Sequence, residues 1–222
     1  LLKYWEGKTK VTDAMQFGSL VHKLILEPKS FNEDYAIFEG SRRAGKAWQE
    51  FSETNQDKKI IKQSELDAAN KILNNAMQHE VVKTMLANAT DKEVELSWEH
   101  KGVKFKGFAD MITTFEGKQC VVDIKTTNDA GNRFYRDLYY NDYKMQLAMY
   151  QEQFSKECDA YIIAIETTTP FNVQVYKLDE SLLFKGWMDY DHYTQKYTEW
   201  NGEPQGYSNT IIEVATEIEE II

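Results

Sequence analysis

Two short turns of the form X-Gly, at Lys101-Gly102 and Glu116-Gly117, constrain the fold of this chain more than any other feature. They separate segments 93–98, 103–115 and 118–126, which carry many β-branched and aromatic residues. Glycine in the second central position is typical of a two-residue hairpin turn. The three segments are therefore predicted to form an antiparallel meander whose register is set by the turns.

This register brings acidic side chains of three strands together. Asp110 lies opposite Asp123 across the second turn, and opposed residues have Cβ atoms roughly 5 Å apart. Glu93 lies opposite Asp110 across the first turn. Asp123 and Lys125 share one face of their strand, because side chains alternate along a strand. Glu95 lies on the same face as Glu93 and is the alternative acid on that strand, although the turn spacing favours Glu93.

Such a cluster of acids and a lysine points to a particular chemistry. Neighbouring carboxylates repel one another unless a divalent cation lies between them. Mg²⁺ prefers a few carboxylate oxygens together with water and substrate phosphate. A nearby lysine can orient the attacking water or offset negative charge in the transition state. The pattern predicts metal-dependent hydrolysis of a phosphodiester.

Composition limits how the chain could bind nucleic acid. The formal charge of −10 argues against a generally basic surface, so contact with DNA must be local. Basic residues gather at 42–46, 101–106 and 133–136, and part of the acidic excess falls in 213–222, which we expect to be a solvated helix or tail. The two cysteines show no paired spacing, which argues against a structural zinc site and a disulfide framework.

The rest of the chain reads as alternating helices and strands of one domain covering 1–222. Segment 30–60 is expected to be irregular, and no element is predicted for residues 1–5. We expect a helix at 14–26, which follows the start signal Thr12-Asp13 and is ended by Glu27-Pro28. Further helices are expected at 64–89, 141–154 and 180–200, and further strands at 161–165 and 173–176. No signal peptide and no apolar span of membrane length is recognised, so a cytoplasmic location is expected.

The order of these features resembles the PD-(D/E)XK nucleases, in particular their RecB-like group and its branch of RecE-type and phage exonucleases, similar to lambda exonuclease. The resemblance extends from residue 17 to residue 150. It rests on the following stretches: 17–28, 42–48, 93–98, 107–110, 123–127 and 146–150.

The resemblance implies a role for each matching residue. Asp110 and Asp123 correspond to metal-binding acids, with the Ile124 carbonyl as a further oxygen ligand and Lys125 as the catalytic lysine. His22, which shares a helix face with Gly18, resembles a histidine that approaches the metal. The remaining residues implied are the strand acid Glu93, the active-site pair Gln146 and Tyr150, and a DNA-binding segment with Arg42, Arg43, Lys46 and Trp48.

The same resemblance implies an α/β fold with a central mixed sheet flanked by helices. It implies a Mg²⁺-dependent deoxyribonuclease, with Mn²⁺ as a substitute, that degrades double-stranded DNA ends from 5′ to 3′ and supplies single strands for recombination. It also implies a phage or prophage origin within a bacterial host, a single-strand annealing protein as partner, and a ring-shaped homo-oligomer of three or four copies.

Two other functions fit part of the pattern. A structure-specific endonuclease of the same fold would use the same acids, because end polarity is not encoded in them. A catalytically inert module that binds DNA ends is the alternative from another class, but the intact Asp110, Asp123 and Lys125 argue against it. A sugar or nucleotide enzyme lacks support, since no P-loop and no dinucleotide-binding glycine motif is found.

Overall fold

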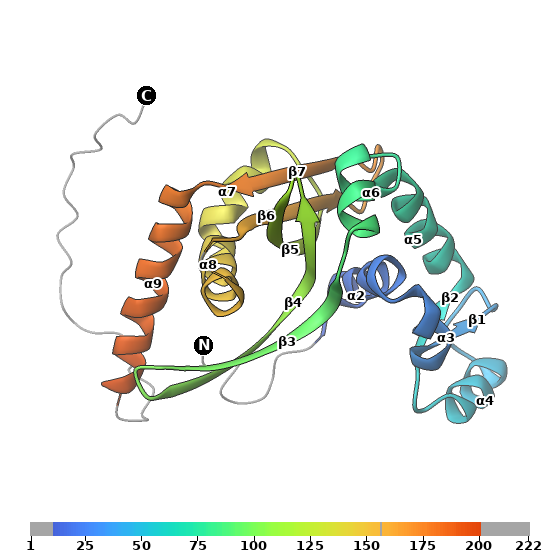
Figure 1. The fold of residues 1–222 in the computed structure, drawn as a ribbon. Helices are drawn as coiled ribbons and strands as arrows, with labels where there is room; N and C mark the ends of the chain where they lie inside the picture. The colour runs from blue at the N-terminus through green and yellow to red at the C-terminus, as the bar shows by residue number, and fades with distance from the viewer. Residues whose placement is uncertain (1–10, 156, 201–222) are drawn as a thin grey trace, which may run out of the picture.

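The computed structural model describes residues 11–155 and 157–200. Its central element is a five-stranded sheet of order β3-β4-β5-β6-β7 (Figure 1). The strands are β3 (Asp91–His100), β4 (Val103–Phe115), β5 (Lys118–Thr127), β6 (Asp159–Glu166) and β7 (Val173–Leu178). β5 and β6 pair in parallel and the other neighbours are antiparallel, so the predicted mixed sheet is confirmed.

Both predicted hairpin turns are present. Lys101 and Glu116 have φ of 50°, and Gly102 and Gly117 have φ of 76° and 79°, so both central residues of each turn are left-handed. This is the backbone of a type I′ turn, whose twist matches that of the flanking strands. The register that the turns predicted is confirmed along both ladders, from His100↔Val103 on β3–β4 and from Phe115↔Lys118 on β4–β5.

Helices cover both faces of the sheet (Figure 1). One face packs against α2 (Asp13–Leu26), α5 (Gln63–Ala76) and α6 (Glu80–Ala87), and its buried side chains include Val122 and Ile124. The other face packs against α7 (Asn132–Tyr140) and α8 (Tyr143–Phe154), behind which lies α9 (Glu180–Thr198). Because side chains alternate along β5, this strand contributes residues to two separate hydrophobic cores, one on each face of the sheet.

The helix predicted at 14–26 is confirmed as α2, and its end signals act as expected. The Thr12 side chain accepts a hydrogen bond from the Met15 N–H at 3.2 Å and so caps the first turn. At the other end, the chain leaves the α-helix before Pro28, which begins the short 3₁₀ helix η1 (Pro28–Ser30).

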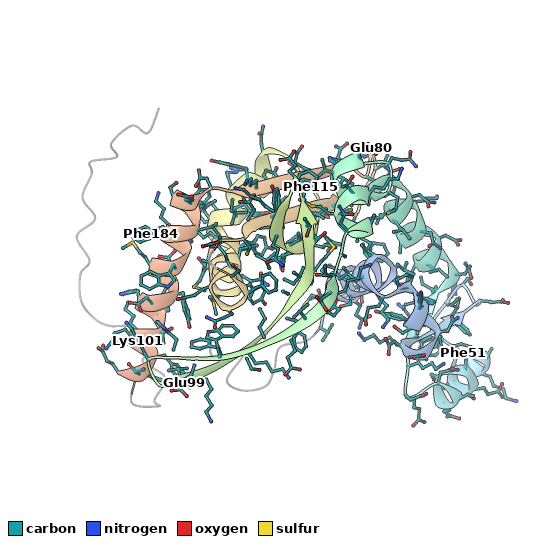
Figure 2. The ribbon with its side chains drawn as sticks, viewed as in Figure 1. Phe51, Glu80, Glu99, Lys101, Phe115 and Phe184 are labelled. Atoms are coloured by element: carbon teal, nitrogen blue, oxygen red, sulfur yellow. The ribbon has the colours of Figure 1, made fainter. Side chains whose placement is uncertain are left out.

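The expectation that segment 30–60 is irregular is wrong. It contains α3 (Phe31–Asp34), β1 (Tyr35–Phe38) and α4 (Lys46–Thr54), and β1 pairs in parallel with β2 (Lys59–Lys62). The small β1–β2 sheet and α4 lie to one side of the large sheet, beyond α2 (Figure 1). Figure 2 shows Phe51 of α4 at one side of the molecule and Lys101, at the tip of the β3–β4 hairpin, at the other.

The prediction of a single helix at 64–89 is also wrong, because the helical conformation is interrupted between α5 and α6. The N–H groups of Gln78 and His79 bond to the carbonyls three residues earlier, which tightens the chain into a turn before α6 begins. The helix α7 was not predicted at all. The helices expected at 141–154 and 180–200 are present as α8 and α9, and the segment 213–222 lies outside the described residues.

Among the described residues, no helix is both long enough and apolar enough to cross a membrane.

Candidate active site

The candidate site begins where β4 and β5 separate. The ladder between them reaches Met111↔Val122, and Asp110 is the next residue on β4. Its Oδ2 accepts the backbone N–H of Ile124 at 2.6 Å, in a buried hydrogen bond. The carboxylate thus takes the place of a ladder carbonyl at the point where β4 and β5 separate, which we call the fork.

His22 and Glu93 converge on Asp110 from neighbouring elements. One donor atom from each of the three residues lies within 4.8 Å of the others, a spacing that could hold a metal ion. The Nδ1 of His22 on α2 lies 3.6 Å from Oδ2 of Asp110. Glu93 has φ of 51°, and the β3–β4 pairing skips both Glu93 and Asp110. A left-handed backbone at a non-glycine residue is costly, and such strain tends to occur at functional sites.

The structure separates the two candidate acids on β3. Glu93 lies in the cluster with Asp110, whereas Glu95 forms a surface ion pair with Lys106 at 3.0 Å. The side chain of Glu95 is 53% exposed. Within the described chain, Glu93 is therefore the β3 acid that the fold brings to this site.

Asp123 and Lys125 form a second group next to this cluster. The Nζ of Lys125 lies 2.6 Å from Oδ2 of Asp123 in an ion pair. On the other side, Nε2 of Gln146 donates to Oδ1 of Asp123 at 3.1 Å and also lies 3.2 Å from the hydroxyl of Tyr150. The structure thus brings Gln146 and Tyr150 of α8 to Asp123, as their spacing of four residues on one helix face allows.

Charge and burial shift the proton affinities of both groups. Burial, and then repulsion from Asp110, raises the pKa of Asp123 to about 6 although Lys125 acts in the opposite direction. Burial and Asp110 also raise the pKa of Glu93. Burial alone would lower the pKa values of His22 and Lys125, but the adjacent carboxylates raise both on balance. The site therefore holds several carboxylates close together in a largely buried place.

The backbone of Ile124 faces the same place. In a strand, the N–H and C=O of one residue point toward the same neighbouring strand, as the paired bonds of an antiparallel ladder show. Since the Ile124 N–H bonds to Asp110, its carbonyl is directed toward the fork as well. This orientation is compatible with the oxygen-ligand role that the resemblance implies for Ile124.

A cavity of about 810 Å³ opens over the cluster. His22, Glu93 and Asp110 line it, together with residues of α2, of the β1–β2 sheet and of the α7–α8 corner. Arg133 of α7 is one of the lining residues and brings positive charge to the cavity.

Two glycines allow the elements around the site to approach closely. A Cβ on Gly18 of α2 would lie 2.9 Å from Oγ1 of Thr126, so α2 can lie against β5 and carry His22 to the cluster. A Cβ on Gly107 would lie 2.7 Å from the ring of Tyr150. Because Gly107 has no side chain, the Tyr150 ring can lie against it and form its hydrogen bond with Gln146.

The predicted DNA-binding segment lies apart from the acids. Arg42, Arg43, Lys46 and Trp48 are not among the residues that line the cavity. Arg43 forms an ion pair with Glu65 at 2.7 Å, and Trp48 packs edge-on against Phe38 with ring centroids 5.1 Å apart. The structure does not bring these four residues to the acid cluster.

One residue beside Lys125 was missed by sequence reasoning. The Lys125 ammonium lies 5.0 Å from the ring centroid of Tyr143, the first residue of α8. Tyr143 precedes Gln146 by three residues and so belongs near the same helix face, which was the available signal.

The donors at the fork suit a divalent metal ion. Carboxylate oxygens, a carbonyl and water are the usual ligands of Mg²⁺ and Mn²⁺, and an imidazole can complete such a set. Burial, and after it the charge of Asp110, raises the pKa values of Glu93 and Asp123, so both factors oppose ionisation of these acids. A cation at this place would favour their ionised forms.

Comparison with solved structures finds the same fold elsewhere. A Eubacterium rectale protein described as a "putative exonuclease" is similar over 89% of this chain and 71% of its own, with a TM-score of 0.60 and 16% identity. Weaker likenesses are to SSO0001, with 20% identity, coverage of 83% and 86%, and a TM-score of 0.35, and to VC1899 from Vibrio cholerae, with 11% identity, coverage of 84% and 53%, and a TM-score of 0.28.

No curated protein matches the chain. A family model does match, and it covers residues 1–206. The mixed five-stranded sheet flanked by helices is consistent with it, and the chain belongs to the family described as a PDDEXK-like domain of unknown function, DUF3799.

Proposed function

We propose that this chain is a metal-dependent deoxyribonuclease that hydrolyses phosphodiester bonds at the fork between β4 and β5. The observation that carries the proposal is the convergence of His22, Glu93 and Asp110 beside the Asp123–Lys125 ion pair. Membership of a PDDEXK-like family supports it. So does the name of the similar Eubacterium rectale protein.

Each side chain has a role that follows from its contacts. His22, Glu93, Asp110, Asp123 and the Ile124 carbonyl would hold the cation, which, when bound, polarises the phosphate and makes a water more acidic. The Lys125 ammonium orients the attacking water and offsets charge on the phosphate oxygens. Gln146 holds Asp123 in place through its hydrogen bond. Lys125 carries the positive charge of the ion pair with Asp123.

The finer proposal is a 5′-to-3′ exonuclease that acts on double-stranded ends, with Mg²⁺ as cofactor and Mn²⁺ as substitute. The overall charge of −10 fits a protein that binds DNA within a restricted basic channel, with Arg133 as one contribution from the cavity wall. The segment with Arg42, Arg43, Lys46 and Trp48 would contact DNA outside the cavity.

The direct test compares linear and closed-circular duplexes, with labels placed separately on each 5′ and 3′ end. An exonuclease of this polarity releases the 5′ label first from linear DNA, needs Mg²⁺ and leaves closed circles intact. Cleavage of closed circles would instead indicate an endonuclease. Binding of DNA ends without digestion under any metal would indicate an inert end-binding module.

An assembly around DNA is part of the same proposal. A ring of three or four copies would place acidic surfaces outside and basic walls inside, and would agree with a protein that hands single strands to an annealing partner. Light scattering with and without duplex DNA tests the ring. A monomer under both conditions would remove it and leave the proposed chemistry unaffected.

A further inference from the structure

The Lys125 ammonium contacts two side chains from different elements, Asp123 of β5 and Tyr143 of α8. Its Nζ lies 2.6 Å from Oδ2 of Asp123 and 5.0 Å from the ring centroid of Tyr143. The lysine side chain is only 20% exposed, so its charge is largely removed from water. An ammonium within about 6 Å of an aromatic face is attracted to it, and the attraction is stronger when the charge is desolvated.

The ring of Tyr143 is fixed by the corner between α7 and α8. It stacks on Phe134 of α7 with centroids 5.8 Å apart and an interplanar angle of 26°. Phe134 is buried, so it provides a firm backing. Asp142, the residue just before Tyr143, is in the left-handed conformation with φ of 54°. This strained residue turns the chain so that α8 begins with Tyr143 facing β5.

Other contacts hold the corner in place. The ammonium of Lys144 pairs with Asp142 at 3.1 Å and with Asp189 of α9 at 2.9 Å. The α9 backbone approaches so closely that a Cβ on Gly186 would lie 2.3 Å from the Lys144 carbonyl oxygen. The position of Tyr143 is thus set by packing of α7, α8 and α9, independently of the acids at the fork.

We propose that Tyr143 is a positioning residue for Lys125. The aromatic face of Tyr143 holds the Lys125 ammonium beside the cavity. The inference rests on the proposed nuclease function. A lysine on its flexible four-carbon stem loses rotamer freedom when it is held in one place. Two attractive partners on different elements define the position of the charge better than Asp123 alone. Tyr143 also lines the cavity with His22 and Asp110, so it faces the space that a substrate phosphate would enter.

The test replaces Tyr143 with phenylalanine and then with phenylalanines carrying one, three and five ring fluorines. The ring shape is nearly kept while the negative potential of its face falls step by step. Tyr143→Phe is the reference for the series, and relative to it we expect the fluorinated variants to lower kcat progressively by about 2- to 30-fold in total. The KM for DNA should stay unchanged, because the ring acts on the lysine and not on binding of the duplex.

The chain offers a matched control. Tyr161 on β6 lies beneath the ammonium of Lys177 at 5.7 Å, a contact of the same kind that is not part of the site. The same fluorinated series at Tyr161 should leave kcat unchanged. If fluorination at position 143 has no more effect than fluorination at position 161, the positioning role is wrong and the Lys125–Tyr143 contact is packing only.

A readout without DNA or metal separates this inference from the proposed function. In protein with labelled lysines, ring current from Tyr143 should shift the Lys125 Cε protons upfield in a carbon–proton NMR spectrum. The signal is identified by its loss in Lys125→Met, and the upfield shift should disappear in Tyr143→Leu. An unshifted signal in the native protein would overturn the inference. A shifted signal in a protein that digests no DNA under any metal would refute the proposed function while keeping the ring–ammonium contact.

Discussion

The backbone N–H of Ile124 donates a buried hydrogen bond of 2.6 Å to Oδ2 of Asp110. One carboxylate therefore has two tasks. It completes the sheet where β4 and β5 separate, and it contributes charge to the cluster with His22 and Glu93. These tasks can be separated, because an amide oxygen can accept the N–H bond but carries no charge.

Replacement of Asp110 should distinguish structure from chemistry. Asp110→Ala leaves the Ile124 N–H unsatisfied in a buried place, and we expect the free energy of unfolding to fall by about 1–3 kcal/mol. Asp110→Asn keeps an acceptor and should remain close to native stability while losing DNA digestion. Urea unfolding and a digestion assay check this. Equal stability of the two variants would show that the hydrogen bond has little structural weight.

The two glutamates on β3 provide a matched pair for metal binding. Mg²⁺ or Mn²⁺ at about 100 times its Kd should stabilise the native protein by about 2.7 kcal/mol, because it binds only the folded state. Glu93→Gln removes a donor from the cluster and should abolish most of this gain. Glu95→Gln breaks only the surface pair with Lys106 and should keep it. Thermal unfolding of both variants with and without metal measures this stabilisation. If only Glu95→Gln loses the stabilisation by metal, the metal site lies elsewhere.

The raised pKa of Asp123 has a consequence for stability in the absence of metal. Its folded value of about 6 lies above the ordinary value of 3.8, so the folded state favours the protonated acid. The contribution of this group to stability is full below about pH 4 and is lost as the pH rises through about 6. Asp123→Asn, studied with chelator, should therefore unfold at higher temperature than the native protein at pH 8.

This advantage of Asp123→Asn should shrink toward pH 4, because both proteins are then uncharged at position 123. A pair of Tm curves between pH 4 and pH 8 measures it. If Asp123→Asn is less stable than the native protein at pH 8, the ion pair with Lys125 outweighs the burial and repulsion of the carboxylate.

Much of this site follows from local sequence signals. The two X-Gly turns predicted the register that brings Glu93, Asp110 and Asp123 to neighbouring strands, because a two-residue turn leaves little choice of pairing. The α2 helix was equally accessible, since Thr12 and Pro28 mark its ends. Features encoded within a few residues could be predicted without knowledge of the fold.

Features that depend on tertiary contacts could not be predicted in this way. No proline or glycine marks the break between α5 and α6, and the apolar spacing continues across it. The α7 segment carries aromatic residues that are as typical of strands as of helices. The parallel pairing of β1 with β2 joins segments separated by α4, and the left-handed Asp142 is held by its neighbours. The placement of Tyr143 depends on that corner.

Close packing between β4 and α8 predicts the effect of a single methyl group. Gly107→Ala would place a Cβ 2.7 Å from the Tyr150 ring, so this ring, whose hydroxyl accepts a hydrogen bond from Gln146, must shift. We expect a loss of about 1–3 kcal/mol in the free energy of unfolding, as for other overpacked sites, together with lower activity. Gly102→Asn is the control, because position 102 has open space and asparagine tolerates its φ of 76°. Similar stability of the two variants would contradict the close approach.

The most direct measurement of the central claim pairs the native protein with Lys125→Ala. Both are assayed for nucleotide release from linear duplex DNA with Mg²⁺ and with chelator, and for stabilisation by Mg²⁺. Lysine is not a metal ligand, so we expect Lys125→Ala to keep the metal-induced rise in Tm and to lose digestion, while the native protein digests DNA only with metal. Digestion that survives the chelator, or full activity in Lys125→Ala, would contradict the account.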